Sequence, residues 1–186
     1  MATFSITSIE QLACALEKAG FNDGDITALR GYPKLGDLRN VIRSHAQIVT
    51  VKHIVDMDAD PYVPQGWKVE SHKKQGQLEC DPGKIQLYLS ENQKTGKCIE
   101  GNKLREELES QPTLNANLLD YFLAHQELIP EEWKDKYVFF RGTVYRDSNG
   151  NLCVRCLYWS GYRWYWSFLW LVSDFDGNDP AAVAGK

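Results

Sequence analysis

The chain has 186 residues, which is enough to bury the core of one domain with an appendage or of two small domains. Its formal net charge is −4 and it has no block of Lys and Arg, which argues against a protein that binds the backbone of nucleic acids. The apolar runs are far shorter than a membrane span and the N-terminus lacks a signal-peptide pattern, so we expect a cytoplasmic protein unless another route exports or displays it.

Residues 1–46 are predicted to form a small helical segment. The capping-box pattern of Thr7 and Glu10 indicates the start of a helix, and Gly20 suits its end. Two further short helices are expected at 24–30 and 35–44. Three short helices also occur in DNA-reading units, but the basic residues are scattered along this segment. A packing or oligomerisation appendage is therefore favoured.

From residue 47 onward the pattern is that of a domain with both strands and helices. Strands are expected at 48–51, 54–55, 66–70, 77–79 and 84–89, and helices at 101–110 and 115–126. The run from Asp56 to Asp60 has a carboxylate at every second position, and such carboxylates can converge on a cation. No phosphate-binding loop follows it, so we interpret this run as an acidic turn ended by Pro61.

The last third of the chain is predicted to be β structure. A hairpin is expected from 137–145 and 151–159 around the turn at 147–150, where Asn149-Gly150 supplies positive φ. A further strand follows in the aromatic stretch beyond it. Strands, two consecutive helices and a closing antiparallel β-meander predict an α+β fold for residues 47–186.

Four of the six tryptophans lie between Leu157 and Val183, and we expect them to form a scaffold: Trp159, Trp164, Trp166 and Trp170. The last three share one parity, so on a strand they point to one face while Tyr165, Ser167 and Leu169 point to the other. Phe168 has the tryptophan parity, which leaves open a bulge or a strand that is aromatic on both faces. Tyr, Ser, Gly, Asn and Asp between the tryptophans are typical of recognition surfaces. An aromatic β core followed by a polar loop is the alternative.

The run G-x-R-W-x-W-x-x-x-W-L-x-x-D-F-x-x-x-x-P-A-A-V from Gly161 to Val183 resembles the variable segment of diversity-generating retroelement variable proteins. The similarity is greatest to the type found in uncultivated archaea and candidate-phylum bacteria, and it extends over Asp56 to Lys134 but not over the N-terminal helices. In that family a reverse transcriptase miscopies adenines, so AAY codons change to many others but never to Lys, Glu, Gln, Met or Trp. The Trp codon TGG contains no adenine, which would explain a tryptophan scaffold.

The resemblance implies thirteen variable, ligand-binding positions, all occupied by residues that such miscopying can reach: Tyr158, Ser160, Tyr162, Tyr165, Ser167, Phe168, Leu169, Val172, Ser173, Asp176, Gly177, Asn178 and Asp179. The unreachable residues Lys, Glu, Gln and Met number 35 in residues 1–136 and none in residues 137–185. Strand composition accounts for part of this absence, so it favours the resemblance without proving it.

The resemblance also implies a C-type-lectin-like fold for residues 47–186, with the variable region at about 157–183 on its last strands and loops. The expected function is that of a receptor which binds an unknown protein or glycan ligand, without catalysis, cofactor, metal or nucleic acid. A fixed-specificity carbohydrate-binding domain is the alternative. An enzyme is the third class, because formylglycine-generating enzymes use cysteines on this fold, but we see no equivalent arrangement.

The remaining chemical motifs are weak. Cys153 and Cys156 form a C-x-x-C pair within an expected strand, where positions three apart face opposite sides, which opposes a disulfide or a zinc site. Five cysteines, an odd number, suit a reducing compartment. Asp174, Asp176 and Asn178 have the spacing of a calcium loop, but the required glycine and the later glutamate are lacking. The four histidines show no ligand pattern.

Overall fold

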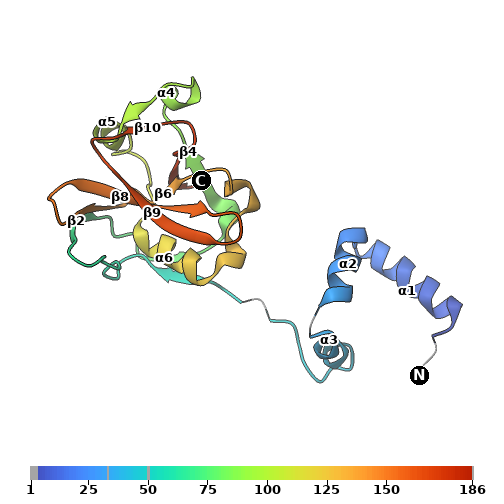
Figure 1. Ribbon diagram of the computed structural model, residues 1–186. Helices are drawn as coiled ribbons and strands as arrows, with labels where there is room; N and C mark the ends of the chain where they lie inside the picture. Colours follow the sequence, from blue (N-terminus) through green and yellow to red (C-terminus); the bar gives the residue numbers. More distant parts are fainter. Residues whose placement is uncertain (1–3, 33, 50, 186) are drawn as a thin grey trace. The chain divides into compact units, whose positions relative to one another are not determined.

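The computed structural model describes residues 4–32, 34–49 and 51–185 (Figure 1). The chain divides into two units, Met1–Val51 and Lys52–Lys186. The sequence pattern placed this division after residue 46. Each unit is described separately below.

The first unit contains three helices, as predicted: α1 (Ile6–Lys18), α2 (Asp23–Gly31) and α3 (Leu35–Ile42). The predicted N-terminal cap of α1 at Thr7 is wrong, because the Ser5 side chain accepts the Ser8 N–H at 3.1 Å and Thr7 is already helical. A reciprocal capping box occurs instead at α2, between Asn22 and Asp25. None of the described residues of the three helices is buried.

The second unit is a mixed α+β fold around a curled sheet of seven strands. The sheet runs β2 (Lys68–His72), β7 (Thr143–Arg146), β8 (Leu152–Trp159), β6 (Val138–Phe139), β11 (Ala181–Ala184) and β4 (Ile85–Tyr88), with β9 (Trp164–Trp170) also paired to β8. Two smaller ladders join β1 (Ile54–Asp56) to β3 (Gln77–Glu79) and β5 (Ile99–Glu100) to β10 (Asp174–Phe175). The expected strand at 48–51 is wrong, because its described residues pair with no other strand.

Of the three helices of this unit, the sequence pattern predicted the last two but not the first. They are α4 (Glu91–Lys94), α5 (Gly101–Glu107) and α6 (Ala116–Ala124), with short 3₁₀ turns at Pro82–Lys84, Gln126–Leu128 and Glu131–Trp133. The prediction at 101–110 is three residues too long. Among the described residues, we find no helix with the length and apolar composition needed to cross a bilayer.

Strand β8 lies at the centre of the sheet. Strand β9 pairs with one edge along seven residue pairs, while β6 and β7 share the other edge end to end. The predicted hairpin is therefore correct, but its first strand is broken at residues 140–142. Gly142 explains the break, since its N–H donates to Leu114 and an added Cβ would lie 2.8 Å from the backbone of Thr113 and Leu114. The break lets β7 continue to β2 and β6 to β11, which curls the sheet.

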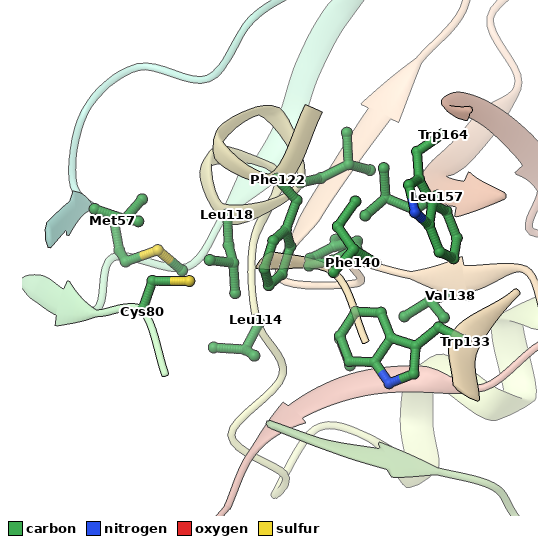
Figure 2. Packing of buried hydrophobic residues seen from close by; sticks show 14 residues of the cluster. Met57, Cys80, Leu114, Leu118, Phe122, Trp133, Val138, Phe140, Leu157 and Trp164 are labelled. Carbon is green, nitrogen blue, oxygen red and sulfur yellow. The ribbon is translucent and has the colours of Figure 1, made fainter. Parts of the chain in front are cut away.

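The sheet is covered on both faces around the β8–β9 hairpin (Figure 1). Helix α6 lies on one face, where its Leu118 and Phe122 belong to the same core cluster as Phe140, Leu157 and Trp164 (Figure 2). Helix α5, β5 and β10 cover part of the other face. Their cluster contains Leu104, Phe139, Val154, Cys156 and Phe175.

A buried ion pair joins α6 to β8. The Arg155 side chain is 1% exposed, and its two terminal nitrogens donate to the carboxylate of Asp120 at 3.0 and 2.7 Å. Trp166 covers the guanidinium with its ring centre 4.5 Å away. This two-point contact fixes the distance and the rotation of the helix relative to the central strand.

We expect Asp120→Ala to lower the free energy of unfolding by about 3 kcal/mol, because it leaves the Arg155 charge buried without a partner. Urea denaturation measures this loss. The matched control is Glu70→Ala, which removes the partly exposed Arg146–Glu70 pair and should cost no more than about 1 kcal/mol. Equal losses for the two variants would contradict the structural role given to the Asp120–Arg155 pair.

Candidate functional site

The β8–β9 hairpin separates two kinds of side chain. Its register pairs Trp159 with Trp164 and Tyr158 with Tyr165, without a bulge. The three tryptophans of β9 and Phe168 therefore lie on one face of the hairpin, together with Arg155, and we call this the tryptophan face. Tyr158, Tyr165, Ser167 and Leu169 lie on the opposite face, the tyrosine face. The parity predicted from the sequence is confirmed.

The tryptophan face contacts the interior. Trp164 is 3% exposed and belongs to the core beneath α6, with Trp159 and Trp166 packed against the same core. The Trp159 and Trp164 rings meet edge to face at 5.5 Å, and the Lys134 ammonium lies 4.2 Å from the Trp159 ring centre. These three tryptophans thus have scaffold positions.

Trp170 shares the parity of the other scaffold tryptophans but does not belong to the core. It is 40% exposed at the end of β9, where its indole N–H donates to the Asp147 carboxylate at 2.9 Å. Asp147 belongs to the turn between β7 and β8 and also accepts the Asn149 and Asn151 N–H groups. Trp170 therefore closes this turn from outside rather than filling the core.

The tyrosine face carries a row of three aromatic rings that spans three chain segments. Tyr137 stacks on Tyr158 at 5.7 Å, and Tyr158 stacks on Tyr165 at 6.0 Å, with interplanar angles of 24° and 27°. We call these three residues the tyrosine row. At the hairpin tip, the hydroxyl of Tyr162 lies 2.5 Å from that of Tyr165, and this hydrogen bond raises the pKa of Tyr165. Tyr162 itself is 73% exposed.

Tyr137 was not among the predicted site residues. Its ring is 48% exposed and continues the row beyond the variable segment. The predicted hairpin alone does not reveal this position, because the register at its turn pairs Tyr145 with Cys153 and, if continued, would set Tyr137 opposite Gly161. The break at 140–142 shifts the register so that Val138 pairs with Leu157, which places Tyr137 opposite Tyr158. Tyr137 also donates its backbone N–H to the Asn178 carbonyl at 2.8 Å, which brings the loop at 176–179 next to the row.

The loop at 176–179 is held mainly through its backbone. The side-chain amide of Gln93, which is 3% exposed, donates to the carbonyls of Asp176 and Asp179 at 2.7 and 3.2 Å. Gln93 is fixed in turn by a capping box with Ser90 at the start of α4. Sequence analysis missed Gln93, because nothing local connects it to a loop more than 80 residues away.

Within the loop, two carboxylates cap backbone groups. Asp179 accepts the N–H of Asp176 at 2.9 Å, and Asp176 accepts that of Asn178 at 2.7 Å. Burial raises the pKa of Asp179.

Among the described residues, no three His, Cys, Asp or Glu side chains gather as metal ligands would. The acidic run is likewise a turn, since Asp56 accepts the Asp58 N–H and Asp58 accepts that of Gly76.

No buried residue of 157–183 stands at a predicted variable position, although Trp159 and Trp166 are only partly buried and Trp170 is exposed. All thirteen predicted variable residues keep part of their surface accessible. The buried residues of this segment all fall at other positions: Leu157, Trp164, Leu171, Phe175, Pro180, Ala181, Ala182 and Val183. Replacement at most of the thirteen positions therefore leaves the buried residues of the segment undisturbed, whereas Phe168 and Leu169 pack against core clusters.

The thirteen positions do not form one surface, however. The structure gathers Tyr158, Ser160, Tyr162, Tyr165 and Ser167 with the loop at 176–179, and Tyr137 joins the two groups. Four predicted residues lie elsewhere. Phe168 is on the tryptophan face against the Trp67 ring at 4.8 Å, and Leu169 packs partly against the α5 cluster. Val172 and Ser173 lie beyond the far end of β9, about 20 Å along the strand from Tyr165.

A hollow of about 490 Å³ lies between α5 and strands β2 and β7, and none of its lining residues is a predicted position. Arg141, at its margin, is 7% exposed and donates one N–H to the Gly101 carbonyl at 3.3 Å. Its guanidinium lies 4.1 Å from the Phe175 ring centre, and burial lowers its pKa to about 9. Arg141 thus contacts Gly101 and Phe175 in the interior and is not part of the predicted ligand surface.

The cysteines are free thiols, as the strand spacing predicted for Cys153 and Cys156. These two residues lie on opposite faces of β8, in different clusters. Burial raises the pKa of each to about 12, and that of Cys80 to about 11.

Two of the histidines lie together although their sequence positions show no pattern. His53 and His125 both lie next to Tyr121, whose hydroxyl is 2.8 Å from His53 Nδ1.

Comparison with protein families, curated proteins and solved structures finds no match to this chain.

Iodoacetamide at about pH 8 should alkylate Cys14 and Cys98 in the folded protein and leave the other three cysteines unmodified. Only the thiolate reacts, and the raised pKa values keep Cys80, Cys153 and Cys156 protonated until the pH approaches 11 to 12. Mass spectrometry after digestion identifies the labelled sites. The same reaction in denaturant should label all five, and labelling of Cys153 in the folded protein would contradict the structure.

Trp164→Ala should lower the free energy of unfolding by about 3 to 5 kcal/mol, because it leaves a large cavity beneath α6. Tyr162→Ala should change it by no more than about 0.5 kcal/mol, because the ring is largely in solvent. Urea denaturation of both variants tests the division between scaffold and surface. A greater loss for Tyr162→Ala than for Trp164→Ala would refute it.

Proposed function

We propose that this chain is a variable protein of a diversity-generating retroelement, a receptor whose ligand surface is altered by targeted miscopying. The domain at 52–186 is assigned a C-type-lectin-like fold in this proposal. The observation that carries it is the separation of burial along residues 157–183, where every buried residue occupies a position that the sequence argument keeps fixed.

The way in which the loop at 176–179 is held supports the same proposal. Gln93 and the Tyr137 N–H bind carbonyl oxygens of Asp176, Asn178 and Asp179, and a carbonyl is present whatever side chain occupies the position. Strand β9 is held by its backbone ladder to β8 in the same way. Only the two carboxylate caps inside the loop depend on the residues that are expected to vary.

The energetics of substitution agree with a surface that tolerates replacement. A change at an exposed position usually alters stability by less than about 0.5 kcal/mol, whereas truncation in the core costs about 2 to 5 kcal/mol. Because natural domains are stable by only about 5 to 15 kcal/mol, many simultaneous replacements survive only if nearly all are exposed. Four of the nine gathered positions are exposed, and the other five are partly buried but belong to none of the core clusters.

The chemistry of the gathered positions suits a protein or glycan ligand. Tyr158, Tyr162 and Tyr165 offer large contact areas on side chains with few rotatable bonds, and mutual stacking restricts them further. Ser160 and Ser167 add small groups that form hydrogen bonds. Arg163, whose guanidinium lies 4.3 Å from the Tyr165 ring centre, adds a fixed positive charge at the rim.

Sequencing the DNA around the 3′ end of the gene tests the proposal. We expect a second, nearly identical copy of the region encoding residues 157–183, differing only where the copy has adenine, and a neighbouring reverse-transcriptase gene. Differences should occur at codons for the thirteen positions and not at the tryptophan codons. A locus without such a copy would remove the basis of the proposal.

The tyrosine row favours one other function, fixed-specificity carbohydrate binding, because sugar faces stack on exposed aromatic rings. A glycan array distinguishes the two. The same glycan bound by this chain and by close relatives with different residues at 158, 162 and 165 would favour the carbohydrate-binding domain. Binding that changes with these residues would favour the diversified receptor.

A further inference from the structure

The helical unit exposes several large apolar side chains. Ile6, Leu12 and Ile42 are 76%, 60% and 83% exposed, and no described residue of the three helices is buried. Helices of 13, 9 and 8 residues are too short to be stable without packing of an apolar face. These helices therefore need a surface that covers their apolar residues.

Helix α1 has one apolar stripe with an acidic edge. Ile9, Leu12 and Leu16 follow the spacing i, i+3, i+7, which places them on one face. Glu10 and Glu17 each follow a residue of the stripe by one position. At 100° per residue, both carboxylates lie along the same edge of the stripe, two turns apart.

Helix α3 repeats this arrangement with the opposite charge. Leu35, Leu38 and Ile42 have the same i, i+3, i+7 spacing. Arg39 and Arg43 each follow a residue of that stripe by one position, on the same side as the carboxylates of α1. Because both charged edges lie on the same side of their stripes, an antiparallel contact between an α1 and an α3 places the acidic edge against the basic edge.

The charge distribution of the whole segment has the same polarity. Residues 1–28 contain four acidic residues and one Lys, a net charge of −3, and residues 29–51 contain four basic residues and one Asp, a net charge of +3. Among the described residues 4–32 and 34–49, however, no ion pair forms within one copy. The complementary edges of α1 and α3 are thus both free for a partner.

We infer that two copies of this chain associate through their helical units, with α1 of each copy packed antiparallel against α3 of the other. A two-fold contact presents the same surface twice, so that surface must be complementary to itself. A surface with one acidic and one basic edge meets this requirement. The contact buries both apolar stripes and forms the Glu–Arg pairs that one copy lacks.

This inference goes beyond the proposed function and does not depend on it. It has a consequence for binding all the same. A dimer carries two tyrosine rows, and simultaneous binding to a repeated ligand strengthens attachment without any new contact in either site.

Charge reversal in the full chain tests the inference. The variants are Glu10→Arg with Glu17→Arg, which makes both edges basic, and Arg39→Glu with Arg43→Glu, which makes both acidic. Sedimentation velocity or light scattering should show a dimer for the unchanged chain. Each variant alone should dimerise at least about tenfold more weakly, and an equimolar mixture of the two should form a heterodimer.

The mixture distinguishes a lost contact from a variant that fails to fold. Only folded variants with edges of opposite charge can associate and recover the mass of a dimer. The matched control is Thr7→Arg with Gln11→Arg, which adds positive charge to the face of α1 opposite the stripe and should leave the dimer unchanged. An unchanged chain that is a monomer at about 100 μM would overturn the inference and indicate that the helices pack within one chain. Variants that still dimerise alone, or a mixture that stays monomeric, would also overturn it.

Discussion

The pair between Arg155 and Asp120 determines how the central strand and helix α6 fit together. A guanidinium that is 1% exposed must have a partner that satisfies its charge, and the two-point contact with Asp120 allows only one position of the helix. Trp166 lies over the Arg155 guanidinium, and Trp164 belongs to the core cluster that also contains residues of α6. These contacts fix the tryptophan face of the hairpin. Near the hairpin tip, the tyrosine face therefore does not have to contribute to the core.

The side chains of a surface can be replaced only if its backbone is held by groups other than those side chains. The hairpin meets this condition through its backbone ladder, and the loop at 176–179 meets it through Gln93 and the Tyr137 N–H. Both supporting residues lie outside the predicted variable segment. Apart from the Asp176 and Asp179 carboxylates, which cap backbone groups inside the loop, the groups that hold this surface are therefore not the side chains that it presents.

Periodicity predicted most elements of the second unit, because its strands and helices have clear apolar faces and Gly150 marks the hairpin turn. It failed at 48–51, where an apolar run of strand-forming residues finds no strand to pair with. Parity showed the direction in which Trp170 points but not its depth, and this residue, at the end of β9, is 40% exposed. The break at Gly142 and the support from Gln93 depend on backbone contacts between distant segments, which one sequence does not encode locally.

The position of Tyr137 limits what the proposed receptor can bind. It lies between the hairpin tip and the loop at 176–179, within the tyrosine row, yet outside the variable segment. Its backbone N–H bond to the Asn178 carbonyl does not depend on which side chains stand at positions 158 and 178. Under the proposed function, every variant of this protein therefore presents one constant aromatic ring at the centre of a changing surface. Ligands that place an apolar or planar group over that ring are favoured in all of them.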